Sequence, residues 1–315
     1  MPTIDLSAPS SAPETDAANV VGTLEGLPRR LALTLAELQY LAVQAGDAPL
    51  PFDVSAPSTA NSLDSRLGQS RASAEDQAYL DALAALNEPG DSLAKRGLVS
   101  EEGVDAGVLG AIGLLAKPTL AVDLDVTAGG IRAKAWHRQS GPAVATLSTN
   151  DGIVFELAWF DSAQWPEELA RVATCPEDVE LDTSQLPEVV DLPYELLDGC
   201  GEAIRTQRTD LLPVIVASHA GQVLDGAGNP VADATVAPLV SALIAETQGR
   251  LRGLAADVAA EGLPIVGVVS WLLLADGWRS LRAHQVGTER RVEVRRVEPS
   301  DLAPLLAPVL AEVSA

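Results

Sequence analysis

The sequence predicts an α+β fold: a quasi-twofold duplicated unit with a central antiparallel β-sheet flanked by helices. Three observations support this prediction. Short segments of alternating apolar and polar residues follow one another, separated by glycine turns. Helical patterns precede and follow these runs of strands, which favours antiparallel pairing. Segment 155–172 also aligns with segment 292–309, and each copy reads as a strand, a turn and an amphipathic helix.

A second block recurs earlier in each half. Residues 98–103 precede a helical run that ends at Ala116, and residues 223–228 precede one that ends at Ala245. The duplicated unit is much longer than a solenoid repeat of about 20–50 residues, so it indicates one pseudo-symmetric domain. We therefore expect a flexible N-terminal tail at 1–28 and a single domain at 29–315, made of repeat one at 29–173, an acidic connector at 174–190 and repeat two at 191–315.

The first predicted helix lies within Leu31–Val43. Thr34 is its expected N-cap, because Glu37 follows three residues later as in a capping box. Its expected buried stripe is Leu35, Leu38, Leu41 and Ala42. Residues 46–72 read as a loop, and a helix that begins at Ser73 is expected to end at the Asn-Glu-Pro-Gly segment 87–90.

The remaining elements follow the same order in both halves. Repeat one contributes strands at 120–126, 131–137, 143–148 and 153–160 and a helix at 162–173, with a strong hairpin signal at Asn150–Gly152. Repeat two contributes helices at 194–207 and 235–247, strands at 251–258, 265–274, 278–284 and 291–297, and a last helix at 300–313.

Composition excludes several classes of function. The net charge of −23 argues against nucleic-acid binding, which needs a footprint of Lys and Arg, and against binding to anionic membranes. The first residues lack the features of a signal peptide, and no apolar run reaches the ~18 residues of a membrane span. We therefore expect a cytoplasmic protein, with Cys175 and Cys200 as free thiols.

Catalytic motifs are lacking in the sequence. The three histidines and two cysteines form no metal-ligand spacing, so we expect no metal, no cofactor and no enzyme. One alternative remains open. Asp123 and Asp125 share a strand face and could mimic a paired acid/base site, although a solvated strand face is the favoured explanation.

Basic residues and tryptophans alternate on three predicted strands. Successive side chains of a strand point to opposite faces of the sheet, so the basic residues and tryptophans at every second position of one strand share one face. Arginine and tryptophan on a sheet face are typical of a protein interface. The expected partner-binding residues are Arg132, Lys134, Trp136, Trp278, Arg282, His284, Arg291 and Arg295. The alternative is that loops or a helix of the same chain cover the tryptophans.

The order of these blocks resembles the EspG family, the chaperones of type VII (ESX) secretion. The resemblance lies in segment 33–41 followed by Leu50-Pro51, in segment 93–103 followed by a helix and Val122–Leu124, and in segment 268–277 followed by 294–302. It covers nearly the whole chain from residue 30. It implies a quasi-twofold α+β fold and a non-catalytic role in the cytoplasm.

The family resemblance also implies the partner. The expected partner is a helical secreted substrate, a PE/PPE-like heterodimer or its equivalent, whose apolar tip the chaperone binds, keeps soluble and delivers to the secretion machinery. We expect this client on the free sheet face and the adjoining C-terminal helix. An alternative function is a non-catalytic scaffold that homodimerises through its sheet face.

Overall fold

The computed structural model describes residues 28–52, 88–177, 179–258 and 266–313. The strands are β1 (Arg29–Thr34), β2 (Val99–Ser100), β3 (Gly103–Val104), β4 (Leu120–Ala128), β5 (Ile131–Ser140), β6 (Ala143–Thr149), β7 (Val154–Asp161), β8 (Val189–Pro193), β9 (Leu224–Asp225), β10 (Gly249–Asp257), β11 (Val266–Leu274), β12 (Gly277–Val286) and β13 (Glu289–Arg296). The helices are α2 (Leu35–Gln44), α4 (Pro89–Lys95), α5 (Ala106–Ala116), α6 (Trp165–Ala173), α7 (Tyr194–Arg205), α8 (Leu212–Ser218), α9 (Asp233–Ala245) and α10 (Leu302–Val313).

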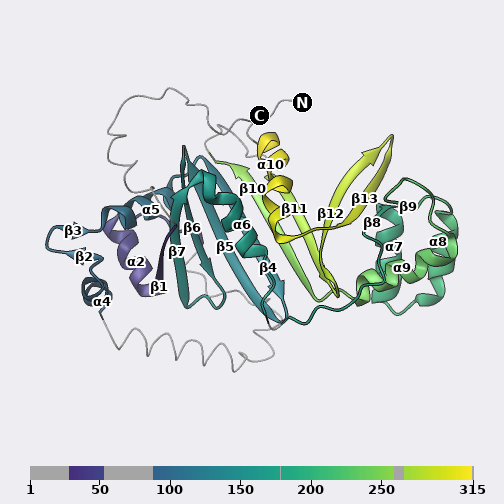
Figure 1. Ribbon diagram of the computed structural model, residues 1–315, viewed down its shortest axis with the longest axis horizontal. Coiled ribbons are helices and arrows are strands. Elements are labelled where there is room, and N and C mark those ends of the chain that lie inside the picture. The colour runs from purple at the N-terminus through teal and green to yellow at the C-terminus, as the bar shows by residue number, and fades with distance from the viewer. Residues whose placement is uncertain (1–27, 53–87, 178, 259–265, 314–315) are drawn as a thin grey trace.

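One antiparallel sheet joins both halves of the chain (Figure 1). Among the described residues it has eleven strands, in the order β1-β7-β6-β5-β4-β10-β11-β12-β13-β8-β9. The strand orders of the two halves correspond outward from the central β4–β10 pair, where Leu124 lies opposite Gly253. Each half therefore adds its own four-strand run to a shared sheet, with β1 as the outer strand on one side and β8 and β9 on the other. The predicted fold class is confirmed, whereas the boundaries of tail, connector and repeats stay predictions.

Helices pack on both sides of the sheet. On one side, α6 and α10 cover the central strands, with Leu169 and Leu306 packed against Leu124 and Trp271. We call this side the α6 face. On the other side, the α5 face, α2 and α5 pack on the β5–β7 end, where Ile112 meets Leu157. At the opposite end of that face, α7, α8 and α9 pack on β8 and β13.

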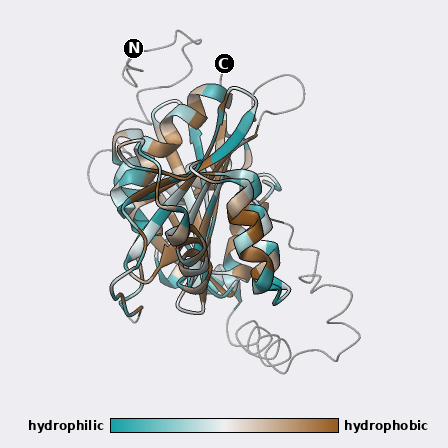
Figure 2. Cartoon of the chain, turned by 90° about the vertical axis from the view of Figure 1, so that its right-hand side faces the viewer, coloured by the Kyte–Doolittle hydropathy of each residue, from teal (hydrophilic) through white to brown (hydrophobic). Residues whose placement is uncertain are grey.

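The helices therefore cover the centre of the α6 face but the two ends of the α5 face. Figure 1 shows α7, α8 and α9 gathered at one end of the molecule and α2, α4 and α5 at the other, with α6 and α10 between them. In Figure 2, hydrophobic and hydrophilic segments alternate along the helices and strands, as expected for elements with one buried side. The centre of the α5 face therefore lies between two helical groups.

Most predicted elements are confirmed, and several details differ. The eight predicted strands correspond to β4–β7 and β10–β13. The capping box at Thr34 and Glu37 is present, although Leu35 is only half-buried. The sequence did not reveal β1, β8 or α8, and Pro89 begins α4 instead of ending a helix. The predicted tail, the helix from Ser73 and most of the 46–72 loop lie outside the described residues.

Two smaller expectations can also be compared with the structure. Cys175 and Cys200 are both free thiols, and Cys200 is buried among α7, α8 and α9. No helix in the described part of the chain is long and apolar enough to cross a membrane.

Candidate functional site

The predicted binding residues do not share one face of the sheet. Residues that pair across neighbouring strands project on the same side. Lys134 pairs with Asp125, and Asp125 pairs with Arg252, all on the α5 face. Trp278 pairs with Leu273, which lies on the α6 face. The expectation of a single surface is therefore wrong: Arg132, Lys134 and Trp136 lie on the α5 face, and Trp278, Arg282, His284, Arg291 and Arg295 lie on the α6 face.

Both predicted tryptophans belong to the core. Trp136 is 9% exposed and stacks at a tilt on Phe52, with ring centroids 5.1 Å apart. Trp278 is 2% exposed, packs against Trp271, and donates a hydrogen bond from Nε1 to the carbonyl of Ala173 at 2.7 Å. Helices and loops of the chain itself thus cover both rings. The alternative interpretation of the tryptophans is the correct one.

Arg291 and His284 join three strands at the far end of the α6 face. Arg291 is 5% exposed, and its Nε donates to Oδ2 of Asp191 at 3.0 Å. Its Nη2 also donates to the carbonyl of Gln222 at 2.7 Å. His284 Nε2 lies 3.0 Å from Oδ1 of the same aspartate. These contacts link β8, β12 and β13, so they stabilise the local fold and leave little of Arg291 for a partner.

Arg282 and Arg295 are exposed on the same strands, with a carboxylate close by. Arg295 Nε donates to Glu293 Oε1 at 3.1 Å, and this hydrogen bond is the main reason why the pKa of Glu293 is lowered. Arg282 lies opposite Glu293 in the β12–β13 pairing, and its positive charge also lowers the pKa of Glu293. The two arginines therefore face a negative neighbour, which reduces their attraction for an acidic partner.

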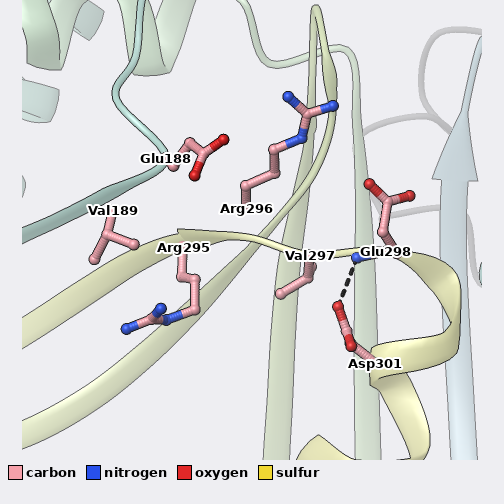
Figure 3. Close-up of a pocket in the computed structure, with 7 residues that line it drawn as sticks. All are labelled: Glu188, Val189, Arg295, Arg296, Val297, Glu298 and Asp301. Carbon is pink, nitrogen blue, oxygen red and sulfur yellow. Dashed lines mark hydrogen bonds between the residues drawn. The ribbon is translucent and has the colours of Figure 1, made fainter. Parts of the chain in front are cut away.

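A shallow pocket lies beside Arg295 (Figure 3). Its volume is about 300 Å³, and it is lined by Glu188, Val189, Arg295, Arg296, Val297, Glu298 and Asp301. One acidic group is already engaged, since the backbone N–H of Glu298 donates to Asp301 Oδ2 at 2.8 Å. Arginines and carboxylates line the same space, so the pocket favours neither anions nor cations, and we assign it no function.

The centre of the α5 face presents a different surface, which we call the central patch. It consists of Asp125, Arg132, Lys134, Arg250, Arg252, Leu254, Val266 and Val268 on β4, β5, β10 and β11. Val266 and Val268 are each 52% exposed, and Leu254 pairs directly with Val268. Lys134, Arg250 and Arg252 are also exposed. Half-exposed valines in the middle of a large sheet are the main apolar feature of this surface.

The two aspartates of the proposed acid/base pair are each bound to an arginine. Asp125 accepts from Arg132 Nη2 at 2.7 Å, and Asp123 accepts from Arg138 Nη1 at 2.6 Å. Each carboxylate therefore has its own guanidinium partner in the structure, and the two aspartates do not share one. Within the described residues, no group of three or more His, Cys, Asp or Glu could hold a metal ion.

Five of the eight residues of the central patch were missed by sequence reasoning. Arg250, Arg252 and Leu254 alternate with Leu251, Gly253 and Ala255, so the period of two that marked the other strands was present here as well. Val266 and Val268 alternate with buried Val269 in a strand that is apolar on both sides, where periodicity gives no signal of exposure.

The fold is EspG-like, with a large antiparallel sheet whose centre lies between two groups of helices on the α5 face of the described residues. A solved structure with a similar fold is that of the Mycobacterium tuberculosis type VII secretion system chaperone EspG5 in complex with the PE25-PPE41 dimer. The TM-score is 0.56 at 11% sequence identity, and the match covers 91% of this chain and 96% of EspG5. No protein-family model matches the sequence, and no curated protein is detectably similar to it.

Proposed function

We propose that this chain is a cytoplasmic, non-catalytic chaperone of type VII secretion that binds a helical secreted client on its central patch. The EspG-like fold supports the class, since the similar EspG5 structure is that of a chaperone in complex with PE25-PPE41. The client of this chain is then a PE/PPE-like protein whose apolar helical tip is shielded until it reaches the secretion machinery.

The main observation in support is the exposure of Val266 and Val268. Two neighbouring valines on the same sheet face, beside Leu254, expose apolar surface that water solvates poorly. Covering such surface contributes about 25 cal/mol for each Å² removed from water. A helical tip with its own apolar residues gains in the same way, so complex formation protects both surfaces from aggregation.

The client position that we propose differs from the one expected from the sequence. The C-terminal helix α10 packs on the α6 face, where Leu302 and Leu306 are buried against β10 and β11. The central patch lies on the opposite face of those strands. We therefore place the client between the two helical groups of the α5 face, and we assign α10 to the core.

The test is affinity purification from the native host with matched variants. Val266→Asp/Val268→Asp should abolish recovery of a helical secreted protein, because two carboxylates replace the apolar contact. The control is Val214→Asp/Val286→Asp, which alters two exposed valines far from the patch. Equal recovery by both double variants would exclude the patch, and a dimeric mass without a client would support the homodimer scaffold instead.

A further inference from the structure

The central patch has two chemically different ends. Rows of paired residues run across the sheet. One row joins Arg132 to Thr127 and Arg250, and the next joins Lys134 to Asp125 and Arg252. The rows beyond these contain, on β10 and β11, Leu254 paired with Val268 and Ala256 paired with Val266. Four cations thus occupy one end of the patch, and aliphatic side chains occupy the other.

Three of these cations have no carboxylate partner among the described residues. Arg132 is bound to Asp125, but Lys134, Arg250 and Arg252 make no side-chain ion pair with any described residue. The patch contains four of the 21 basic residues of a chain with a net charge of −23. Unpaired cations gathered on one surface of so acidic a protein suggest that their counterions come from a partner.

The difference between the cationic and the aliphatic end of the patch also breaks the quasi-twofold symmetry of the sheet. The rotation that exchanges β4 with β10 brings Asp125 to the position of Leu254. It likewise exchanges their neighbours in the next strands, Lys134 and Val268. By the same rule, Arg132 corresponds to Val266 and Asp123 to Arg252. Positions related by the pseudo-axis therefore differ in charge, and a bound helix meets two unequal ends.

We propose that the docking segment of the client is a helix with an apolar end and an acidic end, which lies in one orientation across the patch. Its apolar residues contact Leu254, Val266 and Val268, and its carboxylates contact Arg250, Arg252 and Lys134. This inference rests on the proposed function and adds the charge and direction of the client. A second copy of the chain fits less well, because its patch brings the same four cations and, besides Asp125 bound to Arg132, no carboxylate to pair with them.

Three synthetic helical peptides test the charge requirement. They share one leucine-rich end and carry glutamate, glutamine or lysine at the other end. Titration calorimetry should show the glutamate peptide binding about tenfold more tightly than the glutamine peptide, as expected from a few exposed charge contacts. The lysine peptide should bind weakest. The differences should shrink as salt rises to roughly 0.15 M, where the Debye length is about 8 Å.

Charge reversal in the protein provides the matched control. Arg250→Glu/Arg252→Glu should reverse the preference, so that the lysine peptide binds best. Arg282→Glu/Arg295→Glu makes the same change in net charge on the α6 face and should leave the order unchanged. A photoreactive group at the leucine end of the glutamate peptide should attach to β11 and not to β5.

The outcomes separate this inference from the proposed function. If the three peptides bind equally, or if none binds, the acidic-helix inference is overturned, while client recovery by the Val266 and Val268 variants still decides the function. Attachment of the photoreactive group to β5 would overturn the orientation. A shift to a dimeric mass that competes with the peptides would identify a second copy as the occupant.

Discussion

Buried polar side chains show how single residues are fixed in this fold. His137 is buried beneath α6, and its Nδ1 accepts a hydrogen bond from Trp165 Nε1 at 2.9 Å. The ring is therefore neutral with its proton on Nε2. Burial is the main reason why the pKa of His137 is lowered from 6.5 to about 3, and the nearby Arg138 and Arg171 lower it further.

Stability should depend on pH through this histidine. The unfolded ring binds a proton below about 6.5, while the folded ring does so only near pH 3. The contribution of His137 is thus complete above pH 6.5 and is lost as the pH falls from there towards 3, with a slope of at most about 1.4 kcal/mol per pH unit. Urea unfolding of His137→Gln should show a flatter pH profile than the parent protein. His219→Gln is the control, and a parallel profile in both variants would contradict this assignment.

Trp278 should act as a core residue. Its truncation to alanine removes the packing against Trp271 and leaves the carbonyl of Ala173 without its donor. We expect Trp278→Ala to reduce the free energy of unfolding by about 3–5 kcal/mol. Trp278→Phe keeps most of the volume and should cost less. Urea denaturation measures both, and an unchanged midpoint for the alanine variant would contradict a core role.

At the level of elements, one glutamate links two helices. Glu37 forms the capping box of α2, in which the backbone N–H of Thr34 donates to its Oε2 at 2.9 Å. The same carboxylate accepts from Ser92 Oγ at 2.7 Å and pairs with Arg96 at 3.3 Å, both from the α4 region. Sequence spacing revealed the cap, but the contact with α4 depends on tertiary packing.

Replacing Glu37 should therefore cost more than the loss of an ordinary cap. We expect Glu37→Ala to lower the free energy of unfolding by about 2 kcal/mol, since it removes a cap and leaves the half-buried donors of Thr34 and Ser92 without their acceptor. Glu101→Ala, at an exposed turn, should change it by less than about 0.5 kcal/mol. Thermal or urea unfolding compares the two, and equal small effects would show that the α2–α4 link is unimportant.

The elements that sequence reasoning missed are short or lie beside stronger signals. β1 has six residues and runs directly into the capped helix α2, whose stronger signal hides the alternation of the strand. β8 has five residues at the end of an acidic connector, too few for a clear period of two. Pro89 was read as a helix stop, although proline is also favoured in the first turn of a helix, where α4 has it.

For the whole molecule, strand pairing decides which predicted residues can act together. Alternation along one strand assigns side chains to two faces, but a shift of one residue in any pairing exchanges those faces. Several pairings separate β5 from β12, and their registers place Lys134 and Arg282 on opposite sides of the sheet. The fold class was predictable from the sequence, whereas a surface drawn from distant strands was not.

The central patch differs from the α6-face arginines in the partners available to it. Arg295 has Glu293, and Arg291 has Asp191, so these charges are largely compensated within the chain. Arg250 and Arg252 lack such partners among the described residues and stand beside exposed valines. The central patch and the α6-face arginines are therefore alternative binding sites for a client.

Thiol labelling with and without the client distinguishes the two surfaces most directly. Val268→Cys places a thiol on the central patch, and Arg282→Cys places one on the α6 face, over a low background from half-buried Cys175 and buried Cys200. We predict that the purified client slows maleimide labelling of the Val268→Cys variant and leaves labelling of the Arg282→Cys variant unchanged. Protection of the Arg282→Cys variant alone would contradict it.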